Sequence, residues 1–169
     1  MERNILVAYY SHSANTHKLA KLIHQKIGGN LCKILPEVPY PVFYNAVVEQ
    51  ARKEIQAGYR PALKTKIEHM EAYDTVFIGS PNWCSTIAPP VAAFLEENDL
   101  SGKTVVPFCT HGGGGFARIE SDIAKLCSNA TVLPGLAIYG SGGGNAESQV
   151  SAWLQKIGFA EIKSLSLSR

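Results

Sequence analysis

The sequence has few cysteines, no long hydrophobic run and almost no net charge, and each of these absences excludes a class of protein. The four cysteines form no C-x-x-C pair and have no metal-ligand spacing, which predicts reduced thiols and no metal site. No apolar run approaches the roughly 20 residues that a membrane helix requires. The first four residues lead straight into a strand-like run and do not form a signal peptide. We therefore expect a cytoplasmic protein that does not bind a membrane.

The charge of the chain is balanced as well as small. Its 16 basic and 14 acidic residues are interspersed and give a formal net charge of +2. The absence of a basic stripe argues against a nucleic-acid partner and favours a small ligand. A length of 169 residues and an apolar share of 46% are typical of one globular domain. Residues 1–169 are therefore predicted to fold as a single unit.

Short runs of β-branched and aromatic residues alternate with amphipathic stretches along the chain. Five of these runs predict strands, at residues 5–10, 31–35, 75–79, 104–109 and 131–138. Apolar residues at helical spacing predict helices that include residues 19–27, 91–95, 119–126 and 150–157. This alternation predicts an α/β fold with a doubly wound, five-stranded parallel sheet in the order 2-1-3-4-5 and helices on both faces.

The connection from residue 36 to residue 74 is longer than the others. It opens with three prolines within residues 36–41, and a helical pattern with Val47, Ala51 and Ile55 follows before Gly58. We interpret this segment as the second crossover with an elaborated loop.

Ligands of an open doubly wound sheet bind beyond the carboxyl ends of the strands, where the strand order reverses. For the predicted order this point lies between strands 1 and 3, so the candidate loops are residues 11–16, 80–88 and 110–116. The first loop consists of Ser11, His12, Ser13, Ala14, Asn15 and Thr16. Its amides and hydroxyls would meet at the positive end of a helix, which predicts a site for a phosphate monoester. The alternative is that Ser and Asn only cap the helix.

The first loop also lacks features that other phosphate sites have. It contains no Lys or Arg, no Walker glycines and no dinucleotide-binding glycine pattern. His12 and His17 flank it, either as aids to phosphate binding or as exposed side chains beside a helix start.

The second and third loops carry an aromatic residue and a glycine run. The second contains Pro81, Asn82, Trp83 and Cys84, and the Trp83 indole could lie flat against a planar heterocycle; a rim or core tryptophan is the alternative. The third consists of Thr110, His111, Gly112, Gly113, Gly114, Gly115 and Phe116. Such clustered glycines suit close approach of the backbone to a ligand, whereas a merely flexible loop is the alternative. The three loops together match the phosphate, the flat ring and the polar ring edge of FMN.

At the level of families, the chain resembles the flavodoxin-like proteins over nearly its whole length. The resemblance is carried by Tyr73-Asp74, Gly79, Pro81-Asn82-Trp83, Pro90, Phe94-Leu95, Ser101-Gly102-Lys103, Pro107-Phe108 and Thr110-His111-Gly112-Gly113. These motifs are most similar to a bacterial flavodoxin subfamily with a proline-rich elaboration after the second strand.

The resemblance implies an FMN site and a role for each loop. Residues 11–16 would bind the phosphate, residues 81–84 would line the ribityl chain and the ring, and residues 110–113 would approach the pyrimidine edge. The chain departs from the subfamily pattern at Ser80 and Cys84, where aromatic residues are expected, and at Gly114, where a serine is expected. These departures predict less packing around the ring.

Three functions remain open from the sequence. The first is electron transfer through non-covalent FMN to a redox partner protein, although shuttle flavodoxins are typically strongly acidic and this chain is not. The second is an FMN-dependent NAD(P)H:quinone-type reductase with a small quinone-like acceptor. The third is a non-redox binding module of the same fold. No catalytic residue is assigned, enzyme activity stays undecided, and a homodimer is left open.

The loops also suggest how many electrons are transferred at a time. No carboxylate lies in residues 110–116 and no glycine lies in residues 81–88. A peptide flip near Trp83 would force a residue with a Cβ atom to positive φ, at a cost on the order of 1 kcal/mol. We therefore hypothesise that the protein favours two-electron over one-electron reduction.

Overall fold

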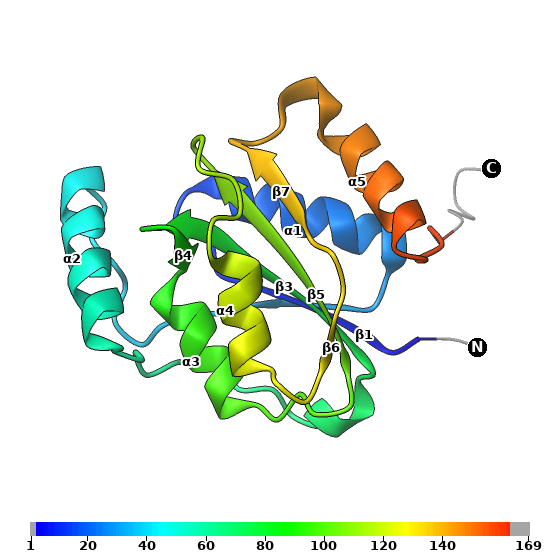
Figure 1. Cartoon of the computed structure of the whole chain (residues 1–169), viewed down its shortest axis with the longest axis horizontal. Coiled ribbons are helices and arrows are strands. Elements are labelled where there is room, and N and C mark those ends of the chain that lie inside the picture. Colours follow the sequence, from blue (N-terminus) through cyan, green and yellow to red (C-terminus); the bar gives the residue numbers. More distant parts are fainter. Residues whose placement is uncertain (1–2, 163–169) are drawn as a thin grey trace.

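The computed structural model describes residues 3–162 and consists of one sheet with helices around it (Figure 1). Its elements follow in the order β1 (Ile5–Tyr9), α1 (Ala14–Ile27), β2 (Asn30–Lys33), α2 (Tyr44–Ala57), a 3-10 turn (Met70–Ala72), β3 (Thr75–Trp83), β4 (Thr86–Ile87), α3 (Pro89–Glu97), β5 (Thr104–His111), α4 (Ile119–Leu126), β6 (Thr131–Val132), β7 (Leu136–Tyr139), a second 3-10 turn (Gly143–Asn145) and α5 (Ala146–Lys156).

The sheet confirms the predicted topology. Its parallel strands lie in the order β2-β1-β3-β5-β6, and β7 also pairs with β5 in parallel. In the order of the predicted strands this is 2-1-3-4-5, with the fifth strand in two pieces. The short β4 pairs with the end of β3 in antiparallel fashion, and the sequence did not predict it.

The prediction of one continuous strand over residues 131–138 is wrong because the chain breaks its pairing at Pro134 and Gly135. Pro134 has no N–H to donate, and its carbonyl accepts a hydrogen bond from the indole Nε1 of Trp153 at 3.0 Å. A Cβ atom on Gly135 would lie 2.5 Å from the Pro107 carbonyl oxygen, so only glycine fits this crossing. The gap separates β6 from β7.

The strand side chains alternate between two cores, one on each face of the sheet. Ile5, Val7 and Tyr9 pack with the buried residues of α1 and α5, and Trp153 of α5 belongs to this core. Leu6 and Ala8 of the same strand pack with α3 and α4 on the other face. The helices can be followed on the two sides of the sheet in Figure 1. The structure therefore confirms helices on both faces.

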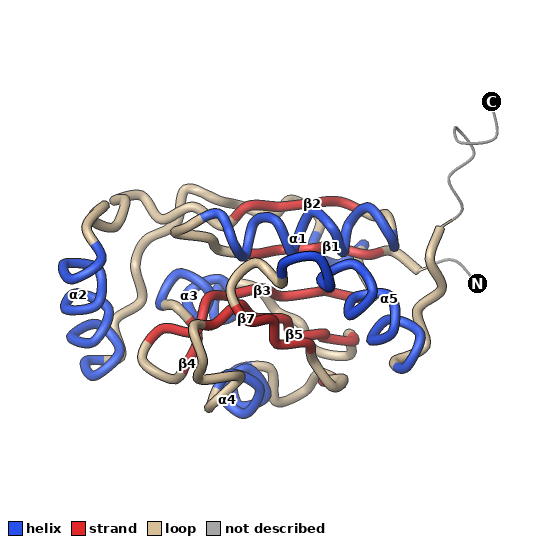
Figure 2. The backbone as a smooth tube through the Cα atoms, turned by 90° about the horizontal axis from the view of Figure 1, so that it is seen from above, coloured by secondary structure: helices blue, strands red, loops and turns tan. Residues whose placement is uncertain are grey.

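Helix α2 is the exception, because it stands away from the sheet. Figures 1 and 2 both place it at the end of the molecule toward which the parallel strands point. Of its side chains only Val47 and Ala51 are buried. The predicted helix in the long crossover is thus present, but it borders the carboxyl edge of the sheet instead of covering a face.

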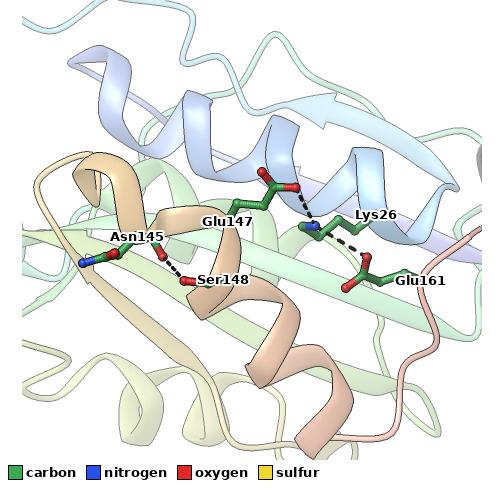
Figure 3. A network of polar contacts seen from close by, with 5 residues as sticks. All are labelled: Lys26, Asn145, Glu147, Ser148 and Glu161. Atoms are coloured by element: carbon green, nitrogen blue, oxygen red, sulfur yellow. Dashed lines mark hydrogen bonds and ion pairs between the residues drawn. The ribbon is translucent and has the colours of Figure 1, made fainter. Parts of the chain in front are cut away.

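The C-terminal end of α1 is joined by ion pairs to α5 and to the segment that follows α5. The Lys26 ammonium group lies 3.2 Å from Glu147 and 3.5 Å from Glu161, with only 10% of its side chain exposed (Figure 3). At the start of α5 the Ser148 hydroxyl donates to the Asn145 carbonyl. The two ion pairs join the last turn of α1 to α5 and to the segment after α5. None of the helices within residues 3–162 is long and apolar enough to cross a lipid bilayer.

Candidate functional site

A cavity of about 610 Å³ opens at the carboxyl edge of the sheet, and all three predicted loops contribute to it. This volume is within the usual range for small-molecule sites, about 300–1,000 Å³. Its lining residues are His12, Ser13, Asn15, Tyr44, Val47, Val48, Ala51, Pro81, Asn82, Trp83, Cys84, Thr110, His111, Gly112, Tyr139 and Gly140. The cavity lies where the strand order reverses, between β1 and β3.

The first loop presents three of its residues, His12, Ser13 and Asn15, to this cavity. Ser13 is the N-cap of α1, yet its side chain makes no capping hydrogen bond. Its hydroxyl is therefore available to a ligand, together with the unpaired amides of the first helical turn. This geometry favours the anion-site interpretation over the alternative of simple helix capping.

The remaining residues of the first loop hold the loop in place. The Ser11 hydroxyl accepts the His17 N–H at 3.1 Å and donates to the Ser13 carbonyl. Thr16 is 1% exposed, and its hydroxyl bonds that of Thr110 at 2.6 Å, which joins the first loop to the third. Ala14 is exposed and outside the lining.

A buried tyrosine beneath the loop fixes the start of α1. The Tyr9 hydroxyl and His17 Nδ1 are 2.5 Å apart. Burial, and to a lesser degree the nearby Cys32 thiol, raise the pKa of Tyr9, so its phenol stays protonated; the tautomer of His17 decides which of the two groups donates. The bond holds His17 on the side of α1 that packs on the sheet.

The second loop is a tight hairpin rather than an open loop. Strand β3 continues through Trp83, and Trp83 pairs with Thr86 across a two-residue turn. Cys84 and Ser85 form this turn with φ of 53° and 73°, the left-handed conformation of a two-residue hairpin turn. The expectation that positive φ is avoided here is wrong, because the turn already requires it. The steric part of the two-electron hypothesis therefore does not hold.

Ser80, one of the departures from the subfamily pattern, is buried before this hairpin. It is 1% exposed, and its hydroxyl accepts the Ala88 N–H at 2.9 Å and donates to the Pro81 carbonyl at 2.7 Å. A small hydroxyl therefore anchors the start of α3 at this position.

Trp83 lies at the cavity wall within a group of aromatic rings. Its ring centroid is 5.0 Å from that of Tyr40, 5.4 Å from that of Tyr10 and 5.9 Å from that of His12, all with edge-to-face geometry. The Tyr40 hydroxyl donates to Glu54 of α2 at 2.5 Å. These contacts fix the orientation of the indole before any ligand binds.

Asn82 connects the hairpin to the glycine-rich third loop. Its Nδ2 donates to the Gly115 carbonyl at 2.8 Å, and its Oδ1 accepts the Ser85 N–H at 3.0 Å. The third loop places Thr110, His111 and Gly112 in the lining.

Gly113 and Phe116 of the third loop are outside the lining. The Gly113 amide donates to His111 Nδ1 at 3.0 Å. Phe116 packs against the core because its ring fills the space beside Gly135.

Sequence reasoning missed two groups of lining residues. Tyr44, Val47, Val48 and Ala51 of α2 form one wall, and nothing in the sequence indicated where this helix packs. Tyr139 is the last residue of β7 and Gly140 follows it, and their position at the end of the predicted fifth strand would have pointed to the same edge of the sheet.

The chemistry of the lining fits a phosphorylated flat ring such as FMN. The lining combines hydroxyls and amides at the start of α1, an indole held by neighbouring aromatic rings, and glycine backbone of the third loop. The lining contains no Lys, Arg, Asp or Glu, so neutral hydrogen bonds and the helix end would hold the phosphate. Fold and cavity together define a doubly wound α/β protein with a ligand site at the switch point.

Comparison with known proteins identifies the family. A sequence profile of the flavodoxin family matches residues 4–157, and the chain belongs to this family. A candidate flavoprotein from Bacteroides eggerthii is similar at 31% identity with a TM-score of 0.82, covering 96% of this chain and 100% of that one. A second, from Bacteroides uniformis, is similar at 26% identity with a TM-score of 0.81, covering 92% and 99%. No curated protein matches the chain.

A structure that contains FMN shares the fold. It is a flavoprotein from Lactobacillus acidophilus in complex with FMN, similar at 22% identity with a TM-score of 0.73, covering 90% of this chain and 99% of that one.

Proposed function

We propose that this protein binds FMN non-covalently in the carboxyl-edge cavity and transfers electrons through it. The observation that carries the proposal is the convergence of the free Ser13 hydroxyl, the oriented Trp83 indole and the Thr110–Gly112 backbone on one uncharged cavity. Membership of the flavodoxin family supports FMN as the ligand. The proline-rich segment at residues 36–41 supports assignment to the bacterial subfamily in which the second crossover is elaborated.

Different residues of the cavity would bind different parts of FMN. Ser13, Asn15 and the first amides of α1 hold the phosphate, because these donors are not used within the helix. Trp83 and Asn82 position the ring, and the backbone near Gly112 approaches its polar edge. FMN itself supplies the redox chemistry when bound.

Helix α2 supplies an apolar wall that excludes water from one side of the cavity. Val47 and Ala51 are buried there, and Val48 and Tyr44 extend the wall outward. Electrostatic interactions within the cavity are stronger where water is excluded.

The same wall favours a second candidate function, reduction of a small acceptor. An uncharged, mostly apolar lining suits a neutral quinone-like molecule. A phosphate-bearing nicotinamide donor would find no Lys or Arg in this lining. We therefore favour a redox protein over NAD(P)H as the electron donor. The acceptor would be a redox protein or a neutral quinone, and the reaction would take place in the cytoplasm.

Purified protein loaded with FMN and reduced under anaerobic conditions separates these functions. Tight binding of FMN with flavin absorbance is expected, and failure to bind FMN would leave only the non-redox module. Stepwise photoreduction followed by mixing with menadione shows whether a neutral quinone accepts the electrons. Reduction by NADPH alone at a catalytic rate would instead establish the NAD(P)H-dependent reductase.

A further inference from the structure

The phosphate end of the cavity has no permanent positive charge. An FMN phosphate carries about −1.5 to −2 charges at pH 7, whereas the lining contains no Lys or Arg. Its groups that can become cationic are the imidazoles of His12 and His111. His111 lies at the end of β5, where its ring contacts Tyr139 and its Nδ1 accepts the Gly113 N–H. His12 belongs to the loop that contains Ser13.

The His12 ring is held on one side and open on the other. Its Nε2 lies 2.7 Å from the Pro41 carbonyl oxygen. Because a carbonyl only accepts hydrogen bonds, Nε2 carries the hydrogen. No residue within 3–162 provides a hydrogen-bond partner for Nδ1. A second proton at Nδ1 would therefore make the ring a cation without breaking its bond to Pro41.

Pro41 connects His12 to the wall of the cavity. It stands three residues before Tyr44, the first residue of α2. The intervening Val42 and Phe43 are 85% and 80% exposed, so they hold the segment only weakly. On the other side of Pro41 the segment is fixed by Tyr40, which is 7% exposed and donates to Glu54 of α2, so the bond from His12 adds to an existing anchor at the start of this wall.

We propose that His12 is a positioning residue for the FMN phosphate, with Nδ1 protonated on FMN binding and Nε2 retained on Pro41. FMN binding then takes up a proton, and the phosphate fastens the segment that leads into α2. Riboflavin, which has no phosphate, does neither. The inference rests on the proposed FMN site.

Other titratable groups lie near His12 and could also make FMN binding depend on pH. The pH range and the control variants distinguish their contributions from that of His12. Tyr10 at the end of β1 and Tyr40 before α2 stay neutral near pH 7, because burial and then Glu54 raise the pKa of both phenols. Cys84 of the hairpin, Tyr44 of α2 and His111 of β5 line the same cavity as His12. His111→Gln and Cys84→Ser serve as matched controls.

The test is the dissociation constant of FMN and of riboflavin for the apoprotein between pH 6.5 and 8.5, measured by flavin fluorescence. For the native chain, FMN affinity should fall by about fivefold as pH rises, the strength of an exposed charge pair, while riboflavin affinity stays constant. The FMN phosphate loses its second proton near pH 6, which would act in the opposite direction. His12→Gln retains a donor for Pro41 but no charge, and should abolish the fall.

Other outcomes would contradict either the role of His12 or the proposed FMN site. A flat FMN profile in the native chain, or a fall that persists in His12→Gln but vanishes in His111→Gln or Cys84→Ser, would overturn the role of His12. Failure to bind FMN at every pH would overturn the proposed function as well.

Hydrogen exchange provides a readout that does not depend on affinity. Amides of residues 42–48 should exchange more slowly with saturating FMN than with saturating riboflavin. His12→Ala, which removes both ring nitrogens, should erase that difference. Equal protection by the two ligands in the native chain would refute the link to α2.

Discussion

Asn82 offers a direct perturbation of the site, because one side chain joins two of its loops. Its amide donates to the Gly115 carbonyl and accepts from the Ser85 amide. Asn82→Ala removes both bonds and leaves a partly buried carbonyl without its partner. At about 0.5–1.5 kcal/mol for each bond, we expect a loss of roughly 1 to 3 kcal/mol in the free energy of unfolding. For a chain of this size, each kcal/mol lowers Tm by about 2–4 °C.

The same substitution should weaken FMN binding by about tenfold, which corresponds to about 1.4 kcal/mol, because the hairpin and the glycine loop would no longer be held at the cavity. Urea unfolding of the apoprotein and FMN titration measure the two effects separately. Asn98→Ala is the matched control: its Nδ2 donates to the Phe94 carbonyl at 2.9 Å, after α3 and outside the cavity lining. It should lose stability and keep its FMN affinity. The reasoning is refuted if Asn82→Ala binds FMN as tightly as the native chain.

Three further outcomes are expected. FMN binding should quench tryptophan emission, and Trp83→Ala should weaken binding by roughly 1–3 kcal/mol, whereas a quench that survives in Trp83→Ala but not in Trp153→Phe would place the ligand elsewhere. Ser85→Gly should stabilise the apoprotein by about 1 kcal/mol in urea unfolding, because the φ of 73° costs glycine nothing; a loss of stability would count against a strained turn. The raised pKa of Tyr40 means that its neutral form stabilises the fold below pH 10 and that this contribution disappears as pH rises further. Between pH 10 and 11.5, Tyr40→Phe should therefore lose less free energy of unfolding than the native chain. Parallel curves of unfolding free energy against pH would contradict the assignment.

Much of the fold could be predicted because the patterns that specify it are local. The strands and helices follow from apolar periodicity, and parallel strands with crossovers allow few topologies. The break at Pro134 was missed because the apolar residues on both sides of it look continuous. The hairpin was missed because Cys84-Ser85 lacks the Asn-Gly or Asp-Gly signal of such turns.

The site was only partly predictable for a different reason. Loops at strand ends can be assigned to the carboxyl edge from topology alone, which brought His12, Trp83 and His111 to one cavity. Helix α2 shows the limit, since an amphipathic pattern indicates that a face is buried but not against what. Thr16 shows a second limit, because its hydroxyl bonds the Thr110 hydroxyl of β5 and the sequence does not reveal that this loop hydroxyl is already paired.

The most direct test of the central claim is a crystal structure of the protein grown with FMN. The account predicts one FMN at the carboxyl edge, with its phosphate on the Ser13 hydroxyl and the first amides of α1, and its ring between Trp83 and the backbone near Gly112. An FMN bound outside this cavity, or one whose ring instead of its phosphate meets the start of α1, would contradict it.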